Sequence, residues 1–230
     1  MDVSKLEEMF SVTFQNKDIL KQAFTHSSYV NEHQKEHLQD NERLEFLGDA
    51  VLELLVSDYL YHKYVQLPEG ELTKLRARIV CEESLSKFAL QLNLHEFILL
   101  GKGEEQSGGR TRQSLLADVF EAFLGAMYID QGIQAVRQFL EKFVFLHLTD
   151  DVLLHMMDYK TALQEFIQEK LKATLVYEII SEKGPSHAKQ FEAQVVVDGT
   201  RKATGVGKTK KEAEQNAAKK MYEQLLQEFA

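Results

Sequence analysis

The sequence has 230 residues, which suits one large domain or two smaller ones, and a hydrophobic content of 44% excludes a disordered chain. Its one cysteine, Cys81, permits no internal disulfide. The first ten residues lack the basic start and apolar run of a secretory signal, and no stretch reaches the roughly 20 apolar residues that cross a bilayer. We therefore expect a cytoplasmic protein without a membrane role.

Charge is distributed unevenly along the chain. Residues 158–230 hold 12 Lys and Arg against 11 Asp and Glu, a net of +1, whereas residues 1–157 hold 15 against 25, a net of −10. This division predicts an acidic module suited to a metal-dependent site, followed by a mildly basic module suited to anion binding. We place the two domains at residues 1–150 and 158–230, with a short linker at 151–157.

The first module is predicted to be helical. Apolar residues recur at spacings of three and four over residues 19–24, 44–64, 72–90, 115–129 and 133–146, and no convincing strand alternation appears there. The glycine-rich segment from Gly101 to Arg112 is predicted to be a flexible polar loop with Arg110 and Arg112 at its end. Such a segment is either functional or simply a long surface connection.

The helix that is predicted to begin after Asn41 carries a stripe of acidic residues. At about 100° per residue, four carboxylates fall within one arc of about 80°: Glu42, Glu45, Asp49 and Glu53. Like charges at helical spacing repel one another, so the stripe indicates a bound cation or a basic partner. The alternative is the solvated outer face of a surface helix.

A second pair of acidic residues, Asp118 and Glu121, interrupts the nearly all-apolar segment 114–129. The two are three residues apart, on one face of the predicted helix, and buried carboxylates need either protons or a cationic partner. Together with Glu45 and Asp49 they predict a four-carboxylate cluster for an oxygen-seeking divalent ion, Mg²⁺ first and Mn²⁺ as a substitute. No His or Cys ligand spacing competes with it.

A nucleophilic site is the enzymatic rival to the metal cluster. It would use His26 together with Ser27 or Ser28. However, neighbouring residues on a helix point in different directions, and a Thr-His-Ser-Ser run is more often a capping or packing feature.

The second module reads as α-β-β-β-α. The predicted elements are a helix at 159–171, strands at 175–181, 190–197 and 200–206, a turn at Gly184-Pro185, a hairpin turn at Asp198-Gly199, and a helix at 209–229 that buries Ala213, Ala217, Met221 and Leu225. Lys208, Lys210 and Lys211 stand where this last helix begins. Lysines, backbone N–H groups and helix dipole then converge as phosphate binding requires, unless the lysines only aid solubility.

Several motifs together resemble those of bacterial ribonuclease III. They are the acidic run from Asn41 to Asp49, the second acidic run from Leu116 to Ala122, the Thr-His-Ser-Ser run at 25–28, the Glu-Gly-Glu-Leu-Thr run at 69–73, the Ser-Gly-Gly-Arg run before the second acidic motif, and a double-stranded-RNA-binding module at the C-terminus. The resemblance implies two domains, an all-α endonuclease domain and an α+β double-stranded-RNA-binding domain.

The same resemblance implies an activity. It implies a homodimeric endoribonuclease that hydrolyses double-stranded RNA with Mg²⁺ and leaves 5′-phosphate and 3′-hydroxyl ends with short 3′ overhangs. Ribosomal RNA precursors and structured mRNAs would be its substrates. A non-catalytic duplex-RNA-binding regulator that dimerises through its first domain is the alternative, which the presence of all four acids disfavours.

The resemblance also implies roles for individual residues. The catalytic and metal-binding acids of the family match Glu45, Asp49, Asp118 and Glu121, and of these we expect Asp49 and Glu121 to be catalytic. Less central acids of the same cleft match Glu42 and Glu69. Phe46 matches an aromatic that inserts into the partner subunit, where Gly48 would permit a close backbone approach, although Phe46 as ordinary core is the alternative. Gln164 and His187 would reach minor grooves, and Lys208, Lys210 and Lys211 would contact phosphates. Glu53 matches no motif position and is expected to be exposed.

Overall fold

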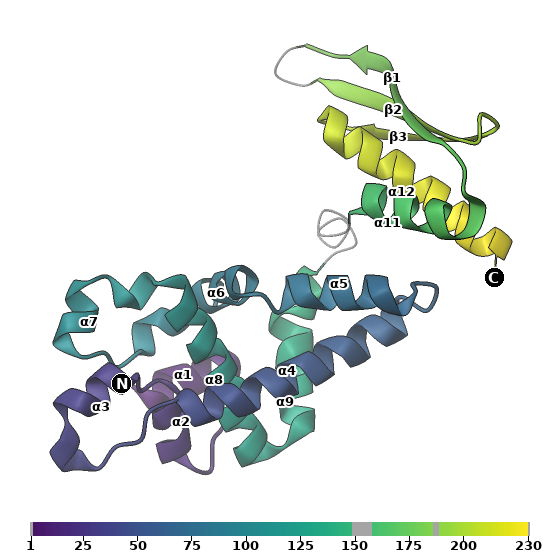
Figure 1. Ribbon diagram of the computed structural model, residues 1–230. Coiled ribbons are helices and arrows are strands. Elements are labelled where there is room, and N and C mark those ends of the chain that lie inside the picture. Colours follow the sequence, from purple (N-terminus) through teal and green to yellow (C-terminus); the bar gives the residue numbers. More distant parts are fainter. Residues whose placement is uncertain (1, 149–157, 186–188, 230) are drawn as a thin grey trace. The chain divides into compact units, whose positions relative to one another are not determined.

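The computed structural model describes residues 2–148, 158–185 and 189–229 (Figure 1). The chain forms two compact units that divide between residues 153 and 154. The first unit is helical and the second combines helices with a sheet, so the predicted fold class is confirmed.

The described part of the first unit contains nine helices, and one of them lies at the centre of the core. They are α1 (Val3–Phe10), α2 (Lys17–Ala23), α3 (Ser27–Glu32), α4 (Glu42–Lys63), α5 (Glu69–Ile79), α6 (Glu82–Gln91), α7 (Lys102–Gln106), α8 (Gln113–Gln131) and α9 (Ile133–Phe143), counted over the described residues. Helix α8 packs against α2, α4, α6 and α9. Its Phe123 is fully buried, and its ring lies 5.3–6.1 Å from four other phenylalanine rings, those of Phe10, Phe14, Phe24 and Phe139.

Helices α4 and α8 cross in direct backbone contact (Figure 1). A Cβ atom on Gly48 would lie 1.8 Å from the carbonyl oxygen of Glu121, and one on Gly125 would lie 2.2 Å from the carbonyl oxygen of Leu44. Only glycine fits at either position. The close approach expected at Gly48 is therefore made to α8 of the same chain, and it brings the acidic residues of the two helices together.

The apolar pattern over residues 72–90 is two helices, so the prediction of one continuous helix is wrong. Helix α5 ends at Ile79, and Cys81 has an extended backbone (φ −71°, ψ 153°) that begins α6. Both helices keep apolar residues at spacings of three and four, and the pattern therefore does not reveal the turn between them.

The segment from Gly101 to Arg112 is also more regular than predicted, since it contains α7 and a 3₁₀ turn (Gly109–Thr111). The Arg110 guanidinium donates to the carboxylate of Glu105 at 2.5 and 2.9 Å, and also to the backbone carbonyls of His95 and Ile98. These contacts tie the polar segment to the helical unit, which is why the expectation of a flexible loop is wrong.

The second unit is an antiparallel sheet, in the order β1-β2-β3, with two helices. The elements are α11 (Tyr159–Phe166) with a following π-helical turn (Ile167–Leu171), β1 (Leu175–Lys183), β2 (Gln190–Val197), β3 (Arg201–Gly207) and α12 (Lys210–Phe229). Asp198 and Gly199 both have positive φ, 53° and 66°, as a tight hairpin turn requires. Helix α12 packs on β2, β3 and α11 and buries Ala213, Ala217, Met221 and Leu225, as predicted.

Candidate active site

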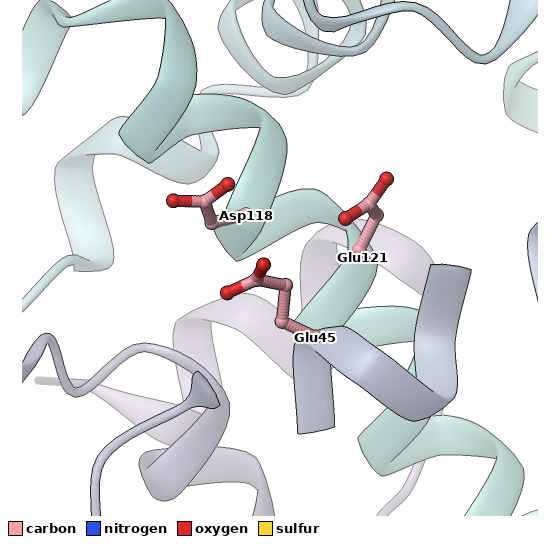
Figure 2. Close-up of side chains that lie close together, drawn as sticks. All are labelled: Glu45, Asp118 and Glu121. Atoms are coloured by element: carbon pink, nitrogen blue, oxygen red, sulfur yellow. The ribbon is translucent and has the colours of Figure 1, made fainter. Parts of the chain in front are cut away.

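Three carboxylates meet where α4 crosses α8 (Figure 2). Glu45 comes from α4, and Asp118 and Glu121 come from successive turns of α8. Each offers one oxygen, these oxygens lie within 4.8 Å of one another, and all three residues are half-buried. An all-oxygen group of this kind suits a hard divalent cation such as Mg²⁺.

The electrostatics of the cluster also fit a cation. Burial is the largest cause that raises the pKa of each of the three carboxyl groups, and neighbouring acids add to it. For Glu121, burial followed by the charges of Asp49, Glu45, Asp118 and Glu53 raises the pKa to about 8. Without a cation, the repulsion between half-buried carboxylates favours a proton in the group.

Two further acids, Asp49 and Glu42, lie on α4 on either side of Glu45 in the sequence. Asp49 is exposed and does not belong to the group of mutually close oxygens, but its charge raises the pKa of Glu45 and Glu121. Glu42 is exposed in the first turn of α4 and lines a pocket of about 330 Å³ together with Glu45 and Asp118. Both therefore act on the cluster through their charge.

The other two predicted acids lie differently. Glu53 is half-buried, and its charge raises the pKa of Glu121, so the expectation of an exposed carboxylate is wrong. The reason is that α4 packs along α8, which half-covers Glu45 and Glu53 of the acidic arc, whereas Glu42 and Asp49 stay exposed. Glu69 begins α5, is exposed, and accepts a hydrogen bond from the Thr73 hydroxyl at 3.1 Å.

Two further residues near the cluster were not predicted as parts of it. The charge of Glu82, the first residue of α6, raises the pKa of Asp118, and His26 lowers it. Nothing in the sequence places Glu82 there, because its position depends on the turn at Cys81. His26 caps α3 through Nδ1, which accepts the Ser28 N–H, and the expected capping role of this run is confirmed.

Phe46 is not a core residue. Its side chain is 80% exposed on α4, although it follows Glu45 directly. It lines a pocket of about 700 Å³ whose apolar residues include Ile19, Leu47 and Ile129. The ordinary-core alternative for Phe46 is therefore wrong, and an exposed aromatic ring beside the acidic cluster needs another explanation.

The predicted RNA-binding residues of the second unit lie on α11 and α12. Lys208, Lys210 and Lys211 are exposed at the start of α12, and Gln164 is exposed on α11, which packs beside it. The Thr209 hydroxyl accepts the Glu212 N–H at 3.1 Å, and the Glu212 carboxylate accepts the Lys208 N–H at 2.7 Å. These two bonds fix the start of the helix and hold the lysines there. His187 lies outside the described residues.

The fold and the acidic cluster define a class of protein, a helical nuclease unit joined to an α-β-β-β-α unit of the duplex-RNA-binding type. A family model described as Ribonuclease-III-like matches residues 16–148, and one described as Double-stranded RNA binding motif matches residues 159–225. Ribonuclease 3 of Oceanobacillus iheyensis is 59% identical over 95% of this chain and 96% of its own. The chain belongs to the ribonuclease III family and is an endoribonuclease with a double-stranded-RNA-binding domain.

Further comparisons agree with this assignment. Ribonuclease 3 of Geobacillus kaustophilus is 57% identical over 96% of this chain and 90% of its own. A crystal structure of the nuclease domain of ribonuclease III from Campylobacter jejuni matches with a TM-score of 0.59 and 39% identity, covering 65% of this chain and 97% of that one. A second structure of that domain, described as showing structural flexibility in a region involved in dimer formation, matches with the same TM-score of 0.59. None of the described helices is long and apolar enough to span a bilayer.

Proposed function

We propose that this endoribonuclease hydrolyses double-stranded RNA with Mg²⁺ held by Glu45, Asp118 and Glu121, and that Mn²⁺ can replace it. The observation that carries the proposal is the meeting of their carboxylate oxygens within 4.8 Å at the crossing of α4 and α8. Asp49, with Glu121 one of the two catalytic acids, would help to place a metal or the attacking water, and Glu42 and Glu69 would serve the same cleft less directly.

The chemistry follows from the donor set. Bound Mg²⁺ would supply an activated water near neutral pH and stabilise charge on the attacking and leaving oxygens. The protein's own contribution is to hold three carboxyl groups close together in a half-buried place, where a bound cation would replace the proton that their raised pKa values favour. Cleavage would leave 5′-phosphate and 3′-hydroxyl ends with short 3′ overhangs. Ribosomal RNA precursors and structured mRNAs are the proposed targets, which would place the protein in the cytoplasm.

The experiment that tests this function compares long duplex RNA with each of its single strands, with and without Mg²⁺. We expect cleavage of the duplex alone, and only with the ion. The ends are then checked by ligation without prior phosphorylation, which requires a 5′-phosphate. A duplex-binding regulator would retain the RNA and leave it intact, and that result would overturn the proposed hydrolysis.

The raised pKa of Glu121 predicts how metal-free stability depends on pH. Because the pKa is about 8 in the folded protein and near 4.5 in the unfolded chain, stability should fall as the pH rises between these values. Glu121→Gln removes this loss. In the presence of a chelator we expect the variant and wild type to melt alike near pH 4.5, and the variant to melt higher at pH 8.5, by about 2–4 °C for each kcal/mol relieved.

Magnesium provides the control for this measurement. Saturating Mg²⁺ at pH 8.5 should raise the Tm of wild type and leave that of Glu121→Gln nearly unchanged, because only the wild type has the full ligand set. A difference between the two proteins that is the same at both pH values would show that Glu121 does not hold the proton.

The second unit is proposed to bind the duplex through phosphates and minor grooves. Lys208, Lys210 and Lys211 would contact phosphates at the start of α12, where the helix dipole adds positive potential. Gln164 on α11 and His187 would reach neighbouring minor grooves, so that the domain spans about 16 base pairs by shape and not by sequence.

Replacing two of these lysines should change the salt dependence of binding. Lys210→Ala with Lys211→Ala is expected to weaken binding to all duplex sequences alike, and to flatten the plot of log affinity against log salt by up to about two units, nearly one for each phosphate contact. Lys219→Ala with Lys220→Ala changes the same charge further along α12 and is the matched control. An unchanged slope in the first variant would leave solubility as the role of these lysines.

We further propose that the protein works as a homodimer joined through Phe46. Burial of an 80% exposed ring in the apolar pocket of a second copy would account for its exposure. A two-fold dimer also matches the antiparallel strands of a duplex, so that each carboxylate cluster would serve one strand.

A mixed dimer tests the division of labour between the two sites. Wild-type subunits are combined with differently tagged Glu121→Gln subunits, and the heterodimer is isolated. We expect it to cut one strand in each binding event, so that it nicks duplex RNA without severing it. Denaturing and native gels of the same product distinguish nicks from double cuts. Two clean cuts from the heterodimer would contradict the assignment of one site to one strand.

A further inference from the structure

Of the two ring nitrogens of His26, Nδ1 alone is hydrogen-bonded to residues that the structure describes. Nδ1 accepts the backbone N–H of Ser28 at 3.2 Å and lies 2.8 Å from the Ser28 hydroxyl oxygen. A nitrogen that accepts an N–H carries no proton, so the neutral ring has its proton on Nε2. The Ser28 hydroxyl then donates to Nδ1, and its oxygen accepts the N–H of Gly101 at 2.9 Å.

The backbone around His26 fixes the ring relative to the acidic helices. The His26 N–H donates to the carbonyl of Leu99 at 3.1 Å, and the carbonyl of Thr25 accepts the N–H of Asn41, which immediately precedes α4. The contact with Gly101 needs glycine, because a Cβ there would lie 2.7 Å from the carbonyl oxygen of Ser28. His26 is therefore held in one orientation at the edge of the cluster.

His26 borders the candidate catalytic pocket. It lines the same pocket of about 330 Å³ as Glu45 and Asp118. Within the part of the chain that the structure describes, Nε2 makes no hydrogen bond. The residues that line the pocket thus combine carboxylates, which would hold cations, with an imidazole that can donate an N–H.

Capping alone does not account for a histidine at this position. A helix N-cap needs only a side-chain acceptor, and Ser, Thr, Asp or Asn supplies it more commonly than His. The imidazole adds a second polar atom, on the side of the ring away from Nδ1, that none of the described residues hydrogen-bonds. Its N–H is suited to an anionic oxygen.

We propose that His26 contacts the substrate by donating its Nε2–H to a non-bridging phosphate oxygen of the RNA strand being cut. This inference rests on the proposed function, because it needs the scissile phosphate beside Asp118 and Glu45. His26 and the metal ligands then contact the same phosphate, and His26 adds specificity for a phosphate seated in the pocket over one that merely approaches the ions.

Two substitutions separate the donor from the cap. His26→Asn keeps an acceptor at the place of Nδ1 and loses the Nε2–H, whereas His26→Gln keeps an N–H donor at the place of Nε2 and loses the cap. We expect His26→Asn to cut duplex RNA about 10- to 100-fold more slowly at saturating Mg²⁺, the effect of one hydrogen bond to a charged group. His26→Gln should keep most of the rate and melt at a lower temperature.

Sulfur substitution identifies the oxygen. Duplexes with either phosphorothioate diastereomer at the cleavage site are cut by wild type and by His26→Asn under single-turnover conditions. We expect one diastereomer to slow wild type and to add little to the loss in the variant. If the rate loss from sulfur and the rate loss from His26→Asn multiply for both diastereomers, the two changes act independently, and the proposed contact would be overturned. His26→Ser, which also keeps a cap acceptor, replaces the Asn variant if that protein does not fold.

Other outcomes also decide the question. If His26→Asn cuts at the wild-type rate at saturating Mg²⁺ and more slowly only below saturation, His26 acts on metal binding through Asp118 and the inference is wrong. If the cleavage rates of all three variants follow their melting temperatures, His26 acts only as the N-cap of α3 and the inference is wrong. Wild-type protein that fails to cut duplex RNA would overturn the proposed function together with this contact, whereas active wild type with equally active variants would overturn the contact alone.

Discussion

Glu121→Gln is expected to lower the cleavage of duplex RNA about a thousandfold or more while leaving duplex binding within about twofold of wild type. Glutamine has the shape of glutamate, so packing on α8 is kept, but a neutral amide is a poor ligand for Mg²⁺. Binding depends instead on the separate second unit. Cleavage is measured at saturating Mg²⁺, and binding by titration with Ca²⁺ in place of Mg²⁺.

Glu53→Gln is the matched control for this loss. It removes the same charge from a half-buried residue that acts on Glu121, but outside the group of close oxygens. We expect its cleavage rate to stay within about threefold of wild type, since no ligand is lost. Normal cleavage by Glu121→Gln at physiological Mg²⁺, or an equal loss in both variants, would remove Glu121 from its proposed central place.

Gly48→Ala is expected to destabilise the protein by about 3 kcal/mol or more and to disrupt the metal site. Helix propensity alone predicts the opposite sign, a gain of about 1 kcal/mol. The contact decides, because the new methyl group would lie 1.8 Å from a backbone oxygen of Glu121, where real Cβ atoms stay beyond 3.0 Å. Helices α4 and α8 must then move apart by about 1.2 Å, the difference between these distances.

The effect is measured by urea unfolding and by the increase of Tm with Mg²⁺, which should vanish as Glu45 moves away from Asp118 and Glu121. Gly70→Ala is the control. Gly70 lies in α5 with nothing within 4 Å of an added Cβ, and there propensity should act unopposed and stabilise the protein slightly. A Gly48→Ala protein of wild-type stability would contradict the direct backbone contact at the crossing.

How much the sequence predicted depended on the range of the interactions involved. The acidic arc of α4 and the Asp118–Glu121 pair were found because helical spacing is local, and the close group of Glu45, Asp118 and Glu121 agrees with that prediction. The assignment of catalytic roles within the group still rests on the resemblance. Asp49 lies outside the close oxygens, which helical spacing alone could not reveal.

The wrong predictions share a different cause. The turn at Cys81 leaves the apolar period of α5 and α6 intact, and Arg110 orders its segment through carbonyls of His95 and Ile98, more than ten residues away. The burial of Glu53 and the approach of Glu82 to Asp118 likewise follow from how helices pack. Packing partners distant in sequence leave no local pattern.

The half-burial of Glu121 also bears on how the nuclease unit matures. Many metal-binding domains do not fold until their ion arrives, because nothing else neutralises the ligands. Here a carboxyl group with a pKa of about 8 keeps its proton at neutral pH, and so removes one charge from the crossing while the helices assemble. The proton thus lowers the repulsion between the two helices before a cation binds, so that closure of the crossing does not by itself require the ion.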